Sequence, residues 1–135
     1  MFPSSTRILV VDDMQSLREL LGAYLRRLGY KDIIEAADGE EAYKMLAESK
    51  INQTPVGLVI SDWNMPNLNG IDLLKLIRAN PDFKKLPFLL TTTESEKPKV
   101  VEAIRSGVTN YMVKPVEEAT LKEKLERTWD KVKPA

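Results

Sequence analysis

Two residue types with versatile chemistry are missing from this sequence, which contains no cysteine and no histidine. Without cysteine, the protein has no thiol nucleophile, disulfide, zinc–thiolate site or iron–sulfur cluster. Without histidine, it has no imidazole base, no histidine-ligated metal and no phosphohistidine of its own. Whatever chemistry the protein performs must therefore use carboxylates, hydroxyls, lysines or backbone groups.

An excess of charge and long apolar segments are also lacking. The 20 basic and 20 acidic residues give a net charge of zero, which argues against binding to nucleic acid or to anionic membranes. The apolar runs, such as residues 8–11, are too short to cross a bilayer. Residues 1–7 lack the apolar stretch of a signal peptide. We therefore expect a cytoplasmic protein.

The length of 135 residues predicts a single domain over 1–135, with short tails at 1–6 and 133–135. A hydrophobic content of 43% and a charged content of 30% are typical of a soluble globular protein. A chain of this length can bury a core without disulfides or metals. It leaves no room for a second functional module, so we expect no attached effector domain.

Short apolar runs alternate with helical patterns along the chain. The apolar runs predict strands around 8–11, 33–34, 58–60, 88–90 and 111–113. Apolar residues at helical spacing predict helices around 17–28, 38–47, 71–77, 98–107 and 121–132, with Asp38 capping the second and Pro98 opening the fourth. Five strand–helix units predict an α/β fold, in which a five-stranded parallel sheet carries helices on both faces.

Polar side chains follow the predicted strands at their carboxyl ends. They are Asp12 and Asp13 after the first strand, Asp62 after the third, Thr91 and Thr92 after the fourth, and Lys114 after the fifth. Ligands of open parallel sheets bind beyond these ends. We therefore expect the three acids, the hydroxyls and the lysine to lie together.

Each of these residues also has a purely structural explanation. Asp12 or Asp13 could cap the first helix, and Asp62 could form a turn. The threonines suit a strand through their β-propensity, and a lysine before proline is usually solvated. Their common position at one edge of the sheet favours a shared site instead.

The residue types indicate which chemistry such a site supports. Two carboxylates about 4 Å apart repel by roughly 4 kcal/mol at an effective dielectric constant of about 20, unless protons, a lysine or a cation compensate them. A cluster of oxygen ligands without histidine or cysteine suits Mg²⁺. Mg²⁺ and Lys114 together could neutralise a phosphoryl group, and a carboxylate can accept one. Asp62 on the central strand is the expected nucleophile, with Asp12 and Asp13 holding the metal.

Four motifs resemble those of a known family. They are Val10-Val11-Asp12-Asp13, Ser61-Asp62-Trp63-Asn64-Met65-Pro66-Asn67 with Gly70, Leu86-Pro87 leading to Thr92, and Tyr111-Met112-Val113-Lys114-Pro115. In this order they resemble the receiver domain of bacterial response regulators, from about Arg7 to Val132. The resemblance implies a flavodoxin-like sheet of order 2-1-3-4-5. Within the family, Trp63, Asn64 and Glu94 are similar to the single-domain chemotaxis type.

The resemblance also implies roles for individual residues. Asp62 is then the phosphoacceptor, and Lys114, which precedes a cis peptide bond, binds a phosphoryl oxygen. Asp13, Asp62 and the backbone carbonyl of Asn64 bind Mg²⁺ directly, while Asp12 contributes mainly through water.

A switch is implied as well. Thr92 is the hydroxyl that moves onto the phosphoryl group, and its choice over Thr91 and Thr93 rests on alignment from Pro87. Tyr111 is the aromatic residue that turns inward behind it, although an aromatic side chain in this strand is also explained as core.

Three residues, Asn64, Thr93 and Glu94, are expected to border the path of water or donor to Asp62. Thr93 stands where many receivers have a smaller residue, which predicts restricted access. Val116 stands where phenylalanine is common in the family, which marks a departure from the family pattern at the expected partner surface.

The expected function is that of a monomeric, phosphorylation-activated binding module, not an enzyme, with self-catalysed phosphorylation and dephosphorylation. Its expected donor is a sensor histidine kinase, its expected partner is the flagellar motor switch protein, and a dedicated phosphatase is a further candidate partner. One alternative is a phosphorelay intermediate that passes phosphate to a histidine phosphotransfer protein. Another is an aspartate-nucleophile phosphatase, against which stands Asn64 in place of a second aspartate. A flavodoxin-like cofactor binder would need a Gly-, Ser- or Thr-rich loop after the first strand.

Overall fold

The computed structural model describes residues 1–93 and 99–134, and within them five parallel strands form one sheet in the order β2-β1-β3-β4-β5. The strands are β1 (Ile8–Val11), β2 (Ile33–Ala36), β3 (Leu58–Asp62), β4 (Phe88–Thr92) and β5 (Asn110–Val113). The helices are α1 (Gln15–Arg27), α2 (Gly39–Ile51), α3 (Gly70–Ala79), α4 (Val100–Arg105) and α5 (Glu118–Val132). The predicted fold and strand order are confirmed.

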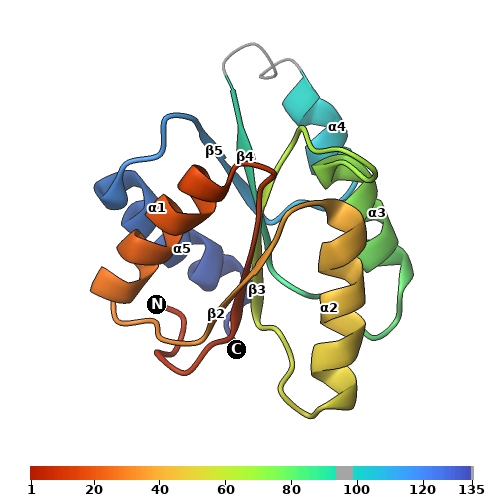
Figure 1. Cartoon of the computed structure of the whole chain (residues 1–135), viewed down its shortest axis with the longest axis horizontal. Helices are drawn as coiled ribbons and strands as arrows, with labels where there is room; N and C mark the ends of the chain where they lie inside the picture. Colours follow the sequence, from red (N-terminus) through yellow and green to blue (C-terminus); the bar gives the residue numbers. More distant parts are fainter. Residues whose placement is uncertain (94–98, 135) are drawn as a thin grey trace.

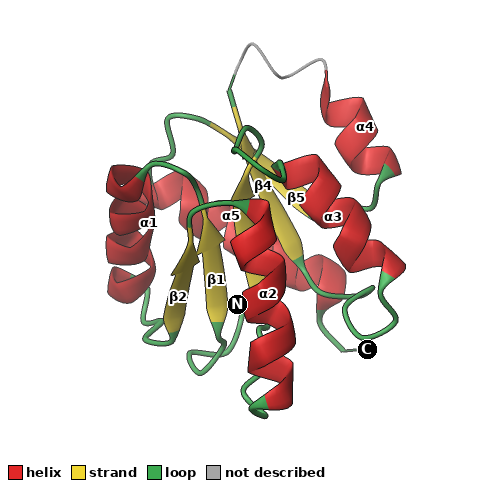
Figure 2. Ribbon diagram, turned by 45° about the vertical axis from the view of Figure 1, so that its right-hand side comes forward, coloured by secondary structure: helices red, strands yellow, loops and turns green. Residues whose placement is uncertain are grey.

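Helices cover both faces of the sheet, with α1 and α5 on one side and α2, α3 and α4 on the other (Figure 1). Figure 2 shows the strands running between these two layers. Because both faces are covered, β1, β3 and β4 are buried along their whole length. This explains why their sequences are continuous apolar runs and not alternating patterns.

Successive side chains of each strand point to opposite faces, which creates two cores. Ile8, Val10, Leu58 and Ile60 pack with Leu21 and Leu25 of α1 and with Leu121 and Leu125 of α5. Leu9, Val11, Val59, Phe88 and Leu90 pack with Leu46 of α2 and with Leu73 and Leu74 of α3.

Local signals in the sequence account for several element ends. Asp38 caps α2, as predicted, since its Oδ1 accepts the backbone N–H of Glu41 at 2.8 Å. Gly29 follows α1 with a φ of 103°, a conformation that glycine adopts readily. The Lys114–Pro115 bond is cis, as the resemblance implied. The predicted helix start at Pro98 and the site residue Glu94 lie outside the described residues.

Within the part of the chain that the structure describes, no helix is both long enough and apolar enough to span a membrane.

Candidate functional site

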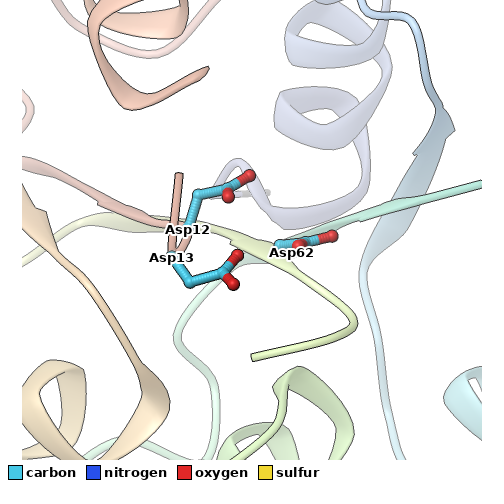
Figure 3. Close-up of side chains that lie close together, drawn as sticks. All are labelled: Asp12, Asp13 and Asp62. Atoms are coloured by element: carbon cyan, nitrogen blue, oxygen red, sulfur yellow. The ribbon is translucent and has the colours of Figure 1, made fainter. Parts of the chain in front are cut away.

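Three carboxylates meet at the carboxyl edge of the sheet (Figure 3). Asp12 and Asp13 follow β1, and Asp62 is the last residue of the adjacent β3. One carboxylate oxygen from each lies within 4.8 Å of the others. Asp12 and Asp62 are buried, whereas Asp13 is exposed, so the cluster opens to solvent on one side. The structure therefore brings together the three acids that the sequence analysis grouped.

Lys114 joins this cluster from the end of β5. Its Nζ lies 3.0 Å from Oδ1 of Asp62 and 3.3 Å from Oδ2 of Asp12. Its side chain is itself largely buried, which strengthens both interactions by keeping water away from them. The interpretation of Lys114 as an ordinary solvated lysine is wrong.

Burial and charge shift the protonation of this pair. Burial raises the pKa of Asp62 above its ordinary value, and the nearby charge of Asp12 adds to the rise, although Lys114 pulls the pKa down. For Lys114, burial alone would lower the pKa, but the hydrogen bonds and charges of Asp62 and Asp12 raise it above its ordinary value. The lysine is therefore held in its charged form beside carboxylates that need a cation.

The helix-cap explanation for Asp12 and Asp13 does not hold. The residue at the N-cap position of α1 is Met14, which makes no side-chain cap hydrogen bond. Asp12 instead accepts the backbone N–H of Met14 at 2.9 Å through Oδ1, while its other oxygen faces Lys114.

Arg18, on the first turns of α1, also touches the site and was missed in the sequence. Its Nη1 donates to the backbone carbonyl of Asp12 at 2.7 Å, and its Nε donates to Glu35 of β2 at 3.0 Å. An arginine near the start of a helix is ordinarily solvated, so no local pattern marks it. A basic residue six positions after an acidic strand end was the signal available.

The loop formed by residues 63–69 begins with a turn that contacts both the side chain and the backbone of Asp62. The backbone N–H of Trp63 donates to Oδ1 of Asp62 at 2.8 Å, and the N–H of Gly70 donates to the carbonyl of Trp63 at 2.9 Å. A Cβ at position 70 would collide with the carbonyl oxygen of Asp62, so the turn requires glycine there. Trp63 is buried, and Asn64 next to it is exposed.

The threonines of β4 divide between the two faces of the sheet. Thr91 pairs with Asp62 in the register of β3 and β4, and its Oγ1 donates to the carbonyl of Ser61 at 3.4 Å. Its side chain lines a hollow together with Asp12 and Lys114. Thr91 was expected among the polar side chains at this edge, and Thr92 was preferred over it only as the switch hydroxyl. A run buried on both faces does not reveal which of the two points where.

Thr92 is completely buried, and its Oγ1 donates to the carbonyl of Thr93 at 3.3 Å. Strand alternation places it on the same face as Leu90, which pairs with Tyr111 of β5. Tyr111 packs partly buried against that core, with the Nζ of Lys124 5.3 Å from its ring centroid. The two proposed switch residues are thus neighbours on one face, and Thr93 beside them is half-buried.

A hollow of about 360 Å³ adjoins the carboxylates on the α1 side. Besides Asp12, Thr91 and Lys114, it is lined by Leu17, Leu20, Leu21, Pro115 and Val116. Val116 therefore lies next to the site.

The donor set fits Mg²⁺. Three carboxylates within 4.8 Å offer hard oxygen ligands, and the exposure of Asp13 leaves room for the water ligands that Mg²⁺ retains. Neither cysteine nor histidine, the ligands that favour softer metals, occurs in the chain.

Comparison with known proteins gives a consistent result. A family model described as the response regulator receiver domain matches residues 8–126. The chain is 45% identical over 123 residues to chemotaxis protein CheY1 of Helicobacter pylori, covering 89% of this chain and 94% of that protein. It is 42% identical over 126 residues to chemotaxis protein CheY-3 of Vibrio cholerae, covering 93% of each.

Solved structures agree with the sequence relatives. Chemotaxis protein CheY4 of Vibrio cholerae superposes with a TM-score of 0.79 at 35% identity, over 92% of this chain and 98% of that one. The receiver domain of a Pseudomonas aeruginosa sensor histidine kinase, solved with a magnesium ion coordinated in its active site cleft, gives a TM-score of 0.78 at 25% identity over 91% of this chain and 96% of that one.

Proposed function

Since this chain belongs to the response regulator receiver domain family, we propose that it accepts a phosphoryl group on Asp62 and signals by binding a partner in that state. Proteins of this kind act in two-component signalling and are not classical enzymes. The observation that carries the proposal is the contact of Lys114 with Asp62 at 3.0 Å, inside a cluster with Asp12 and Asp13.

In the proposed reaction, a carboxylate oxygen of Asp62 attacks the phosphorus atom of a phosphohistidine on another protein. The new P–O bond forms as the P–N bond breaks, and the imidazole leaves with the electron pair and takes a proton from solvent. The Nζ of Lys114 lies close enough to Asp62 to stabilise the negative charge on the phosphoryl oxygens. The N–H of Trp63 holds the attacking carboxylate in orientation.

Asp13, Asp62 and the backbone carbonyl of Asn64 would hold Mg²⁺, with Asp12 acting through water. When bound, Mg²⁺ would offset the negative charge that the carboxylates and the phosphoryl group bring together. The buried position of Asp12 and Asp62 supports this assignment, since buried like charges need a cation nearby.

The signal would arise on the face of β4 that carries Thr92, opposite the face on which Thr91 lines the hollow. Phosphorylation adds a charge of about −1.5 to −2 and three acceptor oxygens. Thr92 would donate to one of them, and Tyr111 would move into the space that it leaves. Shifting the equilibrium between the inactive and active conformations from 1:99 to 99:1 needs about 5.5 kcal/mol. We expect phosphorylation and partner binding each to supply part of this free energy.

The relatives named above are chemotaxis proteins. We therefore propose a chemotaxis-type histidine kinase as donor and the flagellar motor switch protein as partner. The donor must be another protein, because this chain contains no histidine.

Incubation with acetyl phosphate, with and without Mg²⁺, followed by intact-mass measurement tests the acceptor function. We expect a gain of one phosphoryl group that requires Mg²⁺ and is lost in Asp62→Asn. A gain that persists in Asp62→Asn would overturn the assignment.

A binding assay with the motor-switch peptide of the same species tests the output. The phosphorylated protein is expected to bind more tightly than the unmodified one. Equal affinity, combined with rapid transfer to a histidine phosphotransfer protein, would favour a phosphorelay role instead.

A further inference from the structure

The loop formed by residues 63–69, here called the Asn64 loop, is fastened to the start of α2. The side-chain amide of Asn67 donates to Oδ2 of Asp38 at 2.8 Å. The backbone N–H of Gly39 donates to the carbonyl of Leu68 at 3.0 Å. A Cβ at position 39 would collide with that same carbonyl oxygen, so the close approach of the loop to the helix requires glycine there.

Asp38 is itself held firmly. Its Oδ1 accepts the N–H of Glu41 at 2.8 Å as the cap of α2. In return, a carboxylate oxygen of Glu41 accepts the N–H of Ala37 at 3.4 Å. The two oxygens of Asp38 are therefore divided, one serving its own helix and the other serving the Asn64 loop.

The backbone at Asn67 is strained. Its φ is 66°, in the left-handed region, and the N–H of Leu68 donates to the carbonyl of Pro66 at 2.7 Å, closing a three-residue turn. Residues other than glycine adopt this conformation at an energetic cost, and it persists where neighbouring contacts hold it. The bond to Asp38 is such a contact.

The other end of the Asn64 loop is fixed beneath the site. Gly70 lies against the carbonyl of Asp62, and its N–H donates to the carbonyl of Trp63 at 2.9 Å. Asn64, whose carbonyl is the proposed metal ligand, follows Trp63 and so lies in the sequence between this fixed residue and Asn67, which Asp38 binds.

We propose that Asp38 is a positioning residue for the metal site, because through Asn67 it sets the position of the Asn64 loop. This inference rests on the proposed function, in which the Asn64 carbonyl binds Mg²⁺. Asp38 need not contact the metal or the phosphoryl group to affect both.

Two variants separate positioning from folding. Asn67→Gly removes the amide but suits the left-handed backbone, so relief of strain should offset part of the lost hydrogen bond and we expect the fold to be retained. Asp38→Ser keeps a hydroxyl that can cap α2 but lacks the second oxygen. Each is expected to raise the dissociation constant for Mg²⁺ by about tenfold, since loss of the residues that support a metal ligand lowers metal affinity by this order. Tryptophan fluorescence measures the constant.

The double variant Asp38→Ser/Asn67→Gly is expected to bind Mg²⁺ no more weakly than either single variant, because both substitutions remove the same hydrogen bond. The control is Lys75→Ala, which breaks an exposed contact with Glu102 (3.1 Å) elsewhere and should leave the constant unchanged. Wild-type affinity in Asn67→Gly, additive losses in the double variant, or no Mg²⁺ binding by the wild type would overturn the proposal.

This readout separates the positioning role from the proposed function. Mg²⁺ binding is measured without a phosphodonor, so the tenfold loss would still be seen if Asp62 failed to accept a phosphoryl group. In that case the proposed function fails and the positioning role of Asp38 stands.

Discussion

The Nζ of Lys114 lies 3.0 Å from Oδ1 of Asp62, although the two residues end strands that are not neighbours, since β4 lies between β3 and β5. The lysine reaches across β4 to the central strand and also contacts Asp12 at 3.3 Å. One cation from an edge strand thus compensates two buried carboxylates.

Lys114→Met removes that compensation. The pKa of Asp62 is already raised by burial and is expected to rise further, because the hydrogen bond and charge that lower it are lost. The free energy of unfolding should fall by about 1–3 kcal/mol, as for a buried polar group that loses its partner. Carboxyl NMR titration and urea unfolding measure the two effects. Lys133→Met, which alters an exposed lysine, is the control; an unchanged Asp62 pKa would contradict the assigned contact.

The raised pKa of Asp62 predicts a pH dependence of stability. Its ordinary pKa is about 4, and folding favours the protonated form because the folded-state pKa is higher. The contribution of protonated Asp62 to the free energy of unfolding is fully present below about pH 4 and is lost as pH rises through the folded-state pKa. The wild type should therefore lose stability relative to Asp62→Asn over this range. Urea unfolding at several pH values tests this, and a difference that does not vary with pH would rule it out.

Mg²⁺ should stabilise the folded chain through Asp13. At a concentration about 100 times its dissociation constant, a ligand adds about 2.7 kcal/mol to the free energy of unfolding. Asp13→Asn is expected to lose most of this gain, and addition of EDTA should remove it from the wild type. Thermal melts with and without Mg²⁺ provide the measurement. Asp32→Asn, an acid paired with Arg7 away from the cluster, should keep the full gain.

The two buried threonines of β4 should differ in effect. Thr92→Val is expected to leave phosphorylation of Asp62 intact but to abolish the accompanying change at Tyr111, because its hydroxyl is the proposed link between them. Fluorine NMR of labelled tyrosine follows that change. Thr91→Val loses a long hydrogen bond to Ser61 and should retain the coupling. The reverse result would move the switch to Thr91.

Gly70 and Gly22 offer a matched pair of alanine substitutions. Gly70→Ala should destabilise the fold by about 2 kcal/mol or more and impair Mg²⁺ binding, because its Cβ collides with the Asp62 backbone. Gly22→Ala, within α1, meets only the flexible end of Arg26 and should stabilise by about 0.5–1 kcal/mol. Urea unfolding compares them. Equal changes in the free energy of unfolding would show that the turn at Asp62 does not require glycine at position 70.

The sequence was sufficient to predict the sheet and the acid cluster, for one physical reason. Parallel strands place their carboxyl ends at one edge, so Asp12, Asp62 and Lys114 could be grouped from strand ends alone. The apolar runs were clear because the strands are covered on both faces.

The same burial hid other features. A run such as 88–92 has no alternation, so it does not reveal that Thr91 lines the hollow beside Asp12 while Thr92 faces the other core. The contacts of Arg18 with Glu35 and of Asn67 with Asp38 join different strand–helix units, and only the packed structure brings them together.

The proposed chemistry of Asp62 is tested most directly by locating the phosphoryl group. An aspartyl phosphate formed with acetyl phosphate and Mg²⁺ can be reduced with borohydride to homoserine, and peptide mass mapping then finds the modified residue. We predict homoserine at position 62 and aspartate unchanged at positions 12 and 13. Modification at Asp12 or Asp13, or no modification under conditions where Mg²⁺ binds, would contradict the assignment of Asp62 as the phosphoacceptor.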